Sequence, residues 1–231
     1  MIRVFVGFDQ NEAIAYHTFC QSVLSKASEP VSFTPLHLPN LAPFYEETLT
    51  GQEGYPPSNA FIFSRFLVPY LCGFQGFAIF ADGDMVCEAD IAELWSHRPL
   101  DKAVAVVKHD YKTKAATKYL GAPNKDYPRK NWSSVIIWNC GHYMNRVLTP
   151  EYVRNSTGEH LHRFAWLPDE QIAELPPEWN WLAEEYQHKP DVKLIHYTLG
   201  TPCFNEYQHC DYSDRWHVAK QDALHVTQWE R

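Results

Sequence analysis

Several features that would point to a particular class of protein are absent from this sequence or scarce in it. Basic residues are too few for a surface that binds nucleic acid over its whole extent, because 20 Lys and Arg are outnumbered by 28 Asp and Glu, for a formal net charge of −8. The six cysteines form no CxxC pair and show no spacing typical of zinc ligands. Repeats and low-complexity tracts are absent as well. We therefore expect a cytoplasmic protein with reduced cysteines that does not bind nucleic acid.

Long uninterrupted apolar runs are also lacking. The opening apolar run is too short for a signal peptide and is followed by Asp9. The stretch from Phe61 to Ala81 is apolar enough to raise the question of a membrane span, but Arg65, Pro69 and Gly73 interrupt it. We expect no transmembrane segment.

The segments that are present alternate between two kinds of secondary structure. A helix is predicted after Asp9, which stands as an N-cap with Glu12 three residues later. A second helix is predicted over Asn59–Leu71, capped by Ser58 and kinked or ended by its proline, after a loop over Pro39–Ser58. Short apolar runs predict strands at Ile2–Phe8, Val31–Leu38, Phe77–Ala81, Ala103–Val107, Ser134–Trp138 and Val192–His196. The alternation predicts an α/β fold with a mainly parallel sheet and helices on both faces.

One stretch between two predicted strands carries an excess of basic residues, with only two Asp residues against them. Such a stretch is usually a solvated loop. Its length also allows a second interpretation, a mobile flap that faces an anionic ligand, because long loops near sheet ends are often functional. The basic residues are Lys108, Lys112, Lys114, Lys118, Lys125, Arg129 and Lys130.

Two carboxylates follow the predicted strand Phe77–Ala81 directly. Asp82 and Asp84 are two residues apart, so in an extended chain their side chains point to the same side. Gly83 between them leaves room for a ligand to approach the backbone. Carboxylate oxygens at a strand end are ligands that Mg²⁺ or Mn²⁺ accepts, although Asp-Gly-Asp is also a common turn.

A histidine ends the last predicted strand. His196 could complete a metal site with Asp82 and Asp84, or it could be an ordinary buried histidine with its hydrogen bonds satisfied. Spacing cannot distinguish the two interpretations, because residues far apart in sequence meet only in the fold.

Four segments together resemble the GT-A glycosyltransferases of family 8, the glycogenin-like and lipopolysaccharide galactosyltransferase-like group. In order and spacing they span most of the chain, and they are Val6–Asp9, Phe63–Leu71, Phe80–Val86 and His196–Gly200. The resemblance implies a GT-A-like fold in one domain over residues 1–231, with a nucleotide-binding half at 1–110 and an acceptor-binding, metal-completing half at 111–231. It also implies that Asp82, Asp84 and His196 hold Mn²⁺ or Mg²⁺ against the donor diphosphate.

The same resemblance implies a set of donor contacts. Phe8 and Asp9 would contact the base or ribose, although Asp9 can equally be a plain helix cap. Arg65 would lie near the donor phosphates or sugar, or else form a surface ion pair. The remaining implied donor contacts are Gly83, Ser134 and Gly200.

The segment Asp169-Glu170-Gln171 resembles the family's Asp-Gln segment beside the reacting sugar, which implies a catalytic role for these residues. The alternative is a helix start after Pro168. The family transfers sugar with retention, and a double displacement would use Asp169 or Glu170 as nucleophile, whereas a same-face route needs none.

Two departures from the family pattern stand out. The lysine expected shortly after Gly200 is missing, and a residue of the basic stretch, Arg215 or Lys220 are the candidate replacements. The Asn-Ala-Gly strand is altered around Ser133 and Ser134. We nevertheless expect a metal-dependent glycosyltransferase that moves a hexose from a UDP-sugar, of the glucose or galactose class, to an unidentified saccharide or glycoconjugate acceptor. A non-catalytic sugar- or nucleotide-binding protein and a metal-dependent phosphoesterase are the alternatives.

Overall fold

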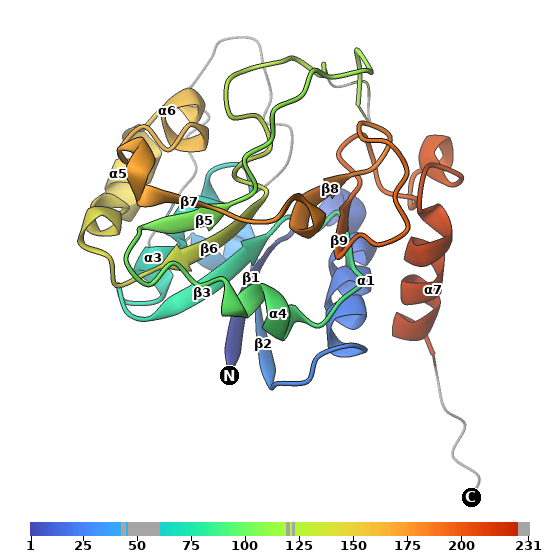
Figure 1. Ribbon diagram of the computed structural model, residues 1–231, viewed down its shortest axis with the longest axis horizontal. Helices are drawn as coiled ribbons and strands as arrows, with labels where there is room; N and C mark the ends of the chain where they lie inside the picture. The colour runs from blue at the N-terminus through green and yellow to red at the C-terminus, as the bar shows by residue number, and fades with distance from the viewer. Residues whose placement is uncertain (43–44, 46–60, 119–120, 122, 226–231) are drawn as a thin grey trace, which may run out of the picture.

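A six-stranded sheet forms the centre of the molecule (Figure 1). The computed structural model describes all residues except 43–44, 46–60, 119–120, 122 and 226–231. In spatial order the strands are β2 (Val31–Leu36), β1 (Ile2–Gly7), β3 (Phe77–Ala81), β6 (Val135–Asn139), β5 (Val104–Val106) and β7 (Ile172–Glu174). Only β6 runs against its neighbours, and the other pairings are parallel. The predicted α/β fold with a mainly parallel sheet is therefore confirmed.

A second sheet of three short strands lies beside the first. β9 (Leu194–His196) pairs antiparallel with β4 (Met85–Cys87) and parallel with β8 (Trp181–Leu182). In the β4–β9 register, Met85 lies opposite His196. This pairing joins the residues just after β3 to the end of the last strand, although more than 100 positions separate them in the sequence.

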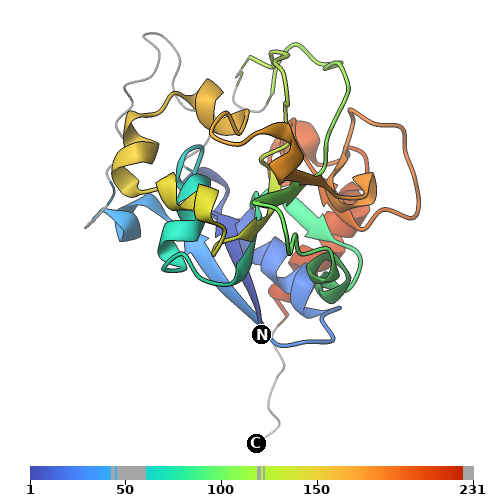
Figure 2. The ribbon, with the colours of Figure 1, turned by 60° about the vertical axis from the view of Figure 1, so that its left-hand side comes forward.

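The central strands are buried on both faces, which explains their continuous apolar runs. Alternate side chains enter two different cores: Val4 packs with Phe19 of α1, whereas Phe5 packs on the other side with Phe66. Helices on the Val4 face include α1 and α4, and those on the Phe5 face include α3, α5 and α6, while α7 packs outside α1 (Figures 1 and 2). Their bounds are α1 (Ala13–Leu24), α2 (Leu38–Leu41), α3 (Val68–Leu71), α4 (Ile91–Ser96), α5 (Pro150–Asn155), α6 (Gly158–His162) and α7 (Ser213–Ala223).

Short 3-10 helices connect many of these elements. They are η1 (Gln10–Glu12), η2 (Ser64–Leu67), η4 (Tyr143–Val147), η5 (Asp169–Gln171), η6 (Pro177–Asn180) and η7 (Asn205–Tyr207). Asp9 caps η1, as predicted, by accepting a hydrogen bond from the Asn11 N–H at 2.9 Å. The longer helix α1 begins only at Ala13.

One predicted helix and one predicted loop need correction. In place of one helix over Asn59–Leu71, the chain forms η2 and then the single turn α3, because Pro69 lacks an N–H and is suited to a first helical turn rather than a helix interior. Residues 58–60, with the predicted cap, lie outside the described residues. The predicted loop after β2 begins with the helical turn α2, which also has its proline in the first turn.

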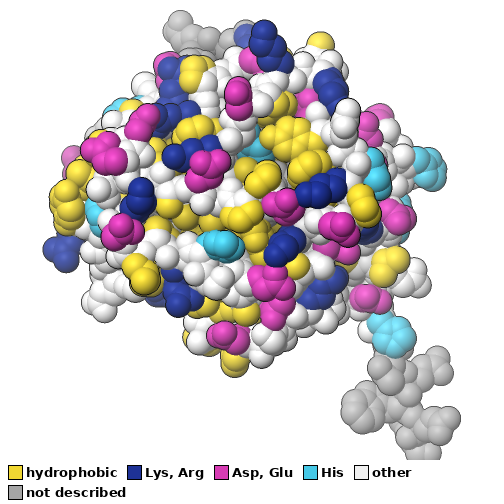
Figure 3. Space-filling view, in the orientation of Figure 1, with side chains coloured by type: hydrophobic (Ala, Val, Ile, Leu, Met, Phe, Trp, Pro, Cys, Tyr) yellow, Lys and Arg dark blue, Asp and Glu magenta, His cyan; other side chains and the backbone are white. Residues whose placement is uncertain are grey.

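None of the helices among the described residues has the length and apolar character that crossing a bilayer requires. On the face shown in Figure 3, acidic and basic side chains are interspersed rather than gathered into one large region of a single sign. The described parts of the basic stretch, residues 108–118 and 123–130, lie above the sheet edge at which β1 and β3 end, in both ribbon views (Figures 1 and 2).

Candidate metal centre

Three predicted metal ligands meet at the edge where β3 ends. Asp82 and Asp84 follow β3, and His196 is the last residue of β9. One ligand atom from each residue lies within 4.8 Å of the others. His196 Nε2 is 3.3 Å from an Asp84 oxygen and 3.7 Å from an Asp82 oxygen. The structure thus brings together the group that the sequence could only propose.

The turn between the two aspartates requires a glycine. A Cβ atom at Gly83 would lie 2.4 Å from the carbonyl oxygen of Gly7, at the end of β1. Backbone cannot move aside as a flexible side chain can, so the close passage of Gly83 over β1 fixes where Asp82 and Asp84 project.

A buried amide fixes the orientation and tautomer of His196. Asn180 Nδ2 donates to the carbonyl of Asn131 at 3.2 Å, so its Oδ1 faces His196 Nδ1, 2.9 Å away. Because an amide oxygen only accepts, His196 Nδ1 carries a proton, and Nε2 is the ring nitrogen that faces the carboxylates.

The side chains fit a divalent cation. In the neutral ring the Nε2 lone pair would point with the carboxylate oxygens at a bound cation, whereas without a cation a protonated His196 supplies the positive charge beside Asp84. Asp84 Oδ1 is buried and accepts no hydrogen bond from the part of the chain that the structure describes. Two carboxylates and an imidazole with its second nitrogen held by an amide form a donor set that binds divalent metals.

Arg65 braces the first aspartate. Its guanidinium lies 2.8 Å from Asp82 Oδ1, donates to the Ser133 carbonyl at 3.0 Å, and lies over the rings of Phe61 and Phe80. Burial raises the pKa of Asp82 to about 6, against the opposing effect of Arg65. The predicted alternative of a surface ion pair is wrong for Arg65, because both partners are buried.

Further charges surround the second aspartate. Burial opposes ionisation of Asp84, but the positive charge and hydrogen bond of a protonated His196, and then the charge of Lys118, outweigh it and lower the pKa of the Asp84 carboxyl. Glu12 is buried nearby and accepts a hydrogen bond from Thr201 Oγ1 at 3.2 Å. Burial, followed by the charge of Asp84, raises the pKa of Glu12 well above its usual range.

The predicted donor contacts lie at the same edge of the sheet. Phe8 follows β1, and its half-buried ring packs edge-on against Tyr16 and His37, with centroids 5.6 and 4.9 Å away. The Ser134 carbonyl accepts from the Asp82 N–H at 2.9 Å. Gly200 closes a turn after β9, donating to the Tyr197 carbonyl at 3.0 Å.

The predicted catalytic segment is not placed beside the metal ligands. Asp169, Glu170 and Gln171 form η5, directly after Pro168, as the helix-start alternative foresaw. The Asp169 side chain is 81% exposed and pairs with Arg129. The Gln171 carbonyl accepts from the Ala103 N–H at the start of β5, the opposite end of that strand from the edge that carries Asp82.

Protein CDI of Arabidopsis thaliana is 41% identical to this chain over 220 residues, which cover 93% of this chain and 84% of Protein CDI. The chain belongs to the family of Protein CDI. No family model matches the sequence.

Several solved structures similar to this one are glycosyltransferases. The bifunctional glycosyltransferase WbbM superposes with a TM-score of 0.65 at 16% identity, over 95% of this chain and 49% of WbbM, so the chain spans about half the length of that protein. An active-site mutant of LgtC superposes with a TM-score of 0.63 at 11% identity, over 98% of both chains. These similarities show that the fold is that of GT-A glycosyltransferases.

Two residues of the site and one beside it escaped prediction from the sequence. The two site residues are Glu12 and Asn180, and His109 lies close enough to His196 to be affected by its charge. Glu12 could be noticed only as part of a helix cap. His109 and Asn180 stand in no pattern, since their partners Tyr186 and His196 belong to other segments.

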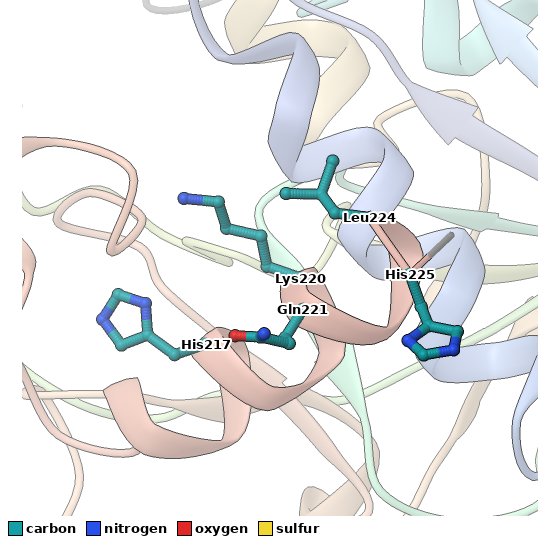
Figure 4. A pocket seen from close by; sticks show the side chains of 5 residues that line it. All are labelled: His217, Lys220, Gln221, Leu224 and His225. Carbon is teal, nitrogen blue, oxygen red and sulfur yellow. The ribbon is translucent and has the colours of Figure 1, made fainter. Parts of the chain in front are cut away.

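One surface depression lies apart from the metal centre. Its side chains all come from α7 or the residues just after it, and they do not converge on a common point (Figure 4). A single exposed helix face of this kind has no buried polar group aimed into it, so it carries no functional assignment. The residues are His217, Lys220, Gln221, Leu224 and His225.

Proposed function

We propose that the chain is a metal-dependent glycosyltransferase of the family 8 type, which moves a hexose from a UDP-sugar to a saccharide or glycoconjugate acceptor with retention. The observation that carries the proposal is the meeting of Asp82, Asp84 and His196, whose ligand atoms lie within 4.8 Å of one another and whose His196 Nε2 faces the carboxylates. The GT-A fold supports it, and LgtC, a galactosyltransferase, is known in complex with donor and acceptor sugar analogues. Glucose or galactose is the proposed sugar class.

The roles of the residues follow from their positions. Asp82, Asp84 and His196 would hold Mn²⁺ or Mg²⁺, which would supply positive charge to stabilise the departing diphosphate. Arg65 keeps Asp82 in place, and Asn180 keeps His196 Nε2 directed at the centre. In this proposal residues 1–110 bind most of the donor, while residues 111–231 complete the metal site and bind the acceptor.

The donor would occupy the edge of the sheet around β1. The ring of Phe8 offers an aromatic face for the base, and Asp9 at the start of η1 a carboxylate for the ribose. Gly83, Ser134 and Gly200 bring backbone rather than bulky side chains to the same edge. This is the end of an α/β sheet at which ligands generally bind.

Binding of a nucleotide sugar without turnover is a second candidate. It is favoured by the position of Asp169–Gln171, the segment to which the resemblance gives a catalytic role. This segment precedes β7 at the end of the sheet opposite the metal ligands, and its Asp169 side chain is exposed and paired with Arg129. The same-face route remains open to an enzyme of this kind, because it requires no protein nucleophile.

The test is a panel of UDP- and GDP-sugars with Mn²⁺, read by thermal shift and by release of the nucleoside diphosphate. The wild-type chain should bind and cleave a UDP-sugar only when Mn²⁺ is present. Asp84→Asn keeps the size of the side chain but removes its charge, and should reduce both signals to background. Asp101→Asn changes an exposed aspartate in a loop and should leave both unchanged.

Three other outcomes separate the alternatives. Mn²⁺-dependent binding without release of the diphosphate supports the binding protein. Hydrolysis of phosphate esters that carry no sugar supports a phosphoesterase. Absence of both binding and turnover over the whole panel refutes the glycosyltransferase.

A further inference from the structure

The buried imidazole of His109 has one nitrogen that is paired and one that is not. His109 is 7% exposed, and its Nδ1 lies 2.7 Å from the Tyr186 hydroxyl. Its Nε2 is buried and has no hydrogen-bond partner among the residues that the structure describes. A buried polar atom without a partner is destabilising, so a ligand group that hydrogen-bonds to Nε2 would bind favourably.

The central sheet places His109 at the edge that carries the metal ligands. β3 and β5 both pair antiparallel with β6, so they run in the same direction and end at the same edge. Asp82 follows β3 directly, and His109 comes three residues after Val106, the end of β5. The Trp132 indole N–H donates to the His109 carbonyl at 3.0 Å. Trp132 stands two residues before Ser134, whose carbonyl accepts from the Asp82 N–H at 2.9 Å.

Tyr186 connects His109 to the smaller sheet, which carries the third metal ligand. The Tyr186 N–H donates to the Leu182 carbonyl at 2.9 Å, and Leu182 of β8 lies opposite His196 of β9. Tyr186 is therefore one turn of chain away from a residue that is paired with a metal ligand. Its hydroxyl fixes the orientation of the His109 ring beside this centre.

Aromatic rings surround the pair of His109 and Tyr186. The Tyr111 ring lies edge-on to both, with centroids 6.2 Å from His109 and 5.7 Å from Tyr186, and the Trp181 ring lies 5.0 Å from Tyr186. Tyr111, Tyr186 and Trp181 are half-buried, so each keeps some exposed surface. The Tyr111 hydroxyl accepts from Asn131 Nδ2 at 2.8 Å and keeps its own hydrogen to donate. Rings with a few fixed polar groups suit a sugar, which has apolar C–H faces and hydroxyls that need partners.

The protonation state of His109 favours a hydroxyl over a phosphate as the partner of Nε2. Burial, and then the positive charge of His196, lowers the pKa of His109 to about 3, so the ring is neutral at neutral pH. A neutral imidazole can donate to a hydroxyl or accept from it, whereas an anion gains most from a charged donor.

The order of the strands puts His109 on the sugar side of the metal centre. In the proposed function the base lies by Phe8 after β1, and the diphosphate lies at the metal after β3. The sheet continues from β3 through β6 to β5, away from β1. Neighbouring strands are about 4.8 Å apart, so the ends of β3 and β5 are separated by about 10 Å, a span that a phosphate and its hexose can cover. The sugar is attached to the diphosphate at the end opposite the nucleoside, and it would therefore extend toward His109.

We propose that His109 Nε2 binds a hydroxyl of the hexose in the donor, with the rings of Tyr111 and Tyr186 beside the sugar. The inference rests on the proposed function and extends it to the recognition of the sugar itself. Tyr186 is a positioning residue, because its hydroxyl holds the His109 ring.

The test compares UDP with UDP-glucose and UDP-galactose, because UDP lacks the hexose. Binding of each to the full chain, with Mn²⁺ and without acceptor, is measured by calorimetry. His109→Phe keeps a ring but removes both nitrogens, and it should weaken binding of the preferred UDP-hexose by about 3- to 10-fold, the effect of losing one hydrogen bond. Binding of UDP should stay within about two-fold of wild type. His109→Gln places an amide near the position of Nε2 and should retain most of the UDP-hexose affinity.

Two further variants guard against an effect on folding alone. Tyr186→Phe removes only the hydroxyl that holds the ring and should give a smaller loss for UDP-hexose, again without a loss for UDP. A matched control is a second tyrosine–histidine pair, in which the Tyr152 hydroxyl lies 2.7 Å from His160 Nε2, between α5 and α6. His160→Phe should leave both affinities unchanged.

UDP-hexoses that lack one hydroxyl at a time separate a direct contact from a structural role. Removal of the hydroxyl that His109 contacts should weaken binding to the wild type but not to His109→Phe, in which the partner is already missing. Removal of any other hydroxyl should affect the two proteins equally.

Three results overturn the inference and leave the proposed function standing. They are unchanged UDP-hexose affinity in His109→Phe, equal losses for UDP and UDP-hexose, and the same dependence on every hydroxyl in the variant and the wild type. Failure of the wild-type chain to bind either UDP or a UDP-hexose with Mn²⁺ overturns the proposed function itself.

Discussion

Removal of the Asn180 side chain should loosen the metal centre without touching any metal ligand. Asn180 is completely buried and His196 is 3% exposed, so water cannot readily replace the lost amide. Asn180→Ala leaves His196 Nδ1–H unpaired at a cost of about 1–3 kcal/mol, and it frees the ring to rotate or change tautomer. Loss of such an outer partner typically lowers metal affinity by about 10- to 100-fold.

The assay is a titration with Mn²⁺ followed by the electron paramagnetic resonance signal of the free ion, which disappears on binding. Asn180→Asp keeps an acceptor for Nδ1–H and should hold Mn²⁺ within about three-fold of the wild-type affinity. Asn145→Ala is a matched control, because this asparagine is equally buried but donates to the Ala103 and Asn139 carbonyls at the other edge of the sheet. It should destabilise the fold and leave the Mn²⁺ affinity unchanged. Wild-type affinity in Asn180→Ala, or an equal loss in Asn145→Ala, would refute the reasoning.

Three further changes probe the surroundings of the centre. Burial, and then the positive charge of His196, lowers the pKa of His109 to about 3. As the pH falls below about 6.5, His109 is therefore protonated in the unfolded chain but not in the folded one, and the folded state should lose about 2 kcal/mol of stability by pH 5. Urea denaturation of His109→Gln should show an acid-dependent loss of stability that is smaller by about 2 kcal/mol. Gly83→Ala forces a Cβ against the Gly7 carbonyl, so calorimetry should show reduced Mn²⁺ binding, whereas unchanged binding would contradict the steric argument. Arg65→Ala leaves Asp82 buried without its cation and should reduce the free energy of unfolding by about 3–5 kcal/mol, and a loss below about 1 kcal/mol would show that the ion pair is unimportant.

The long buried strands could be predicted because their chemistry is local. β1 and β3 are continuous apolar runs, as strands covered on both faces must be. The strands β4, β7 and β8 are two or three residues long and carry no periodicity of their own, so only tertiary pairing reveals them. The reversed direction of β6 is likewise visible only in its pairing with β3 and β5, because its apolar run reads the same in either direction.

The candidate site divides in the same way. Asp82 and Asp84 could be recognised from their position after a buried strand, and His196 from the end of another. Their meeting depends on the β4–β9 pairing, which no spacing in the sequence encodes. Asn180 acts through partners that are distant in the chain, the Asn131 carbonyl and His196 Nδ1, so no pattern in the sequence could single it out.

Anomalous diffraction at the manganese edge, from crystals grown with Mn²⁺ and UDP, tests the central claim most directly. We predict one manganese peak in contact with Asp82, Asp84 and His196 and with phosphate oxygens of UDP. UDP bound without a manganese peak at these three side chains, or manganese bound elsewhere with the three left unliganded, would contradict the account.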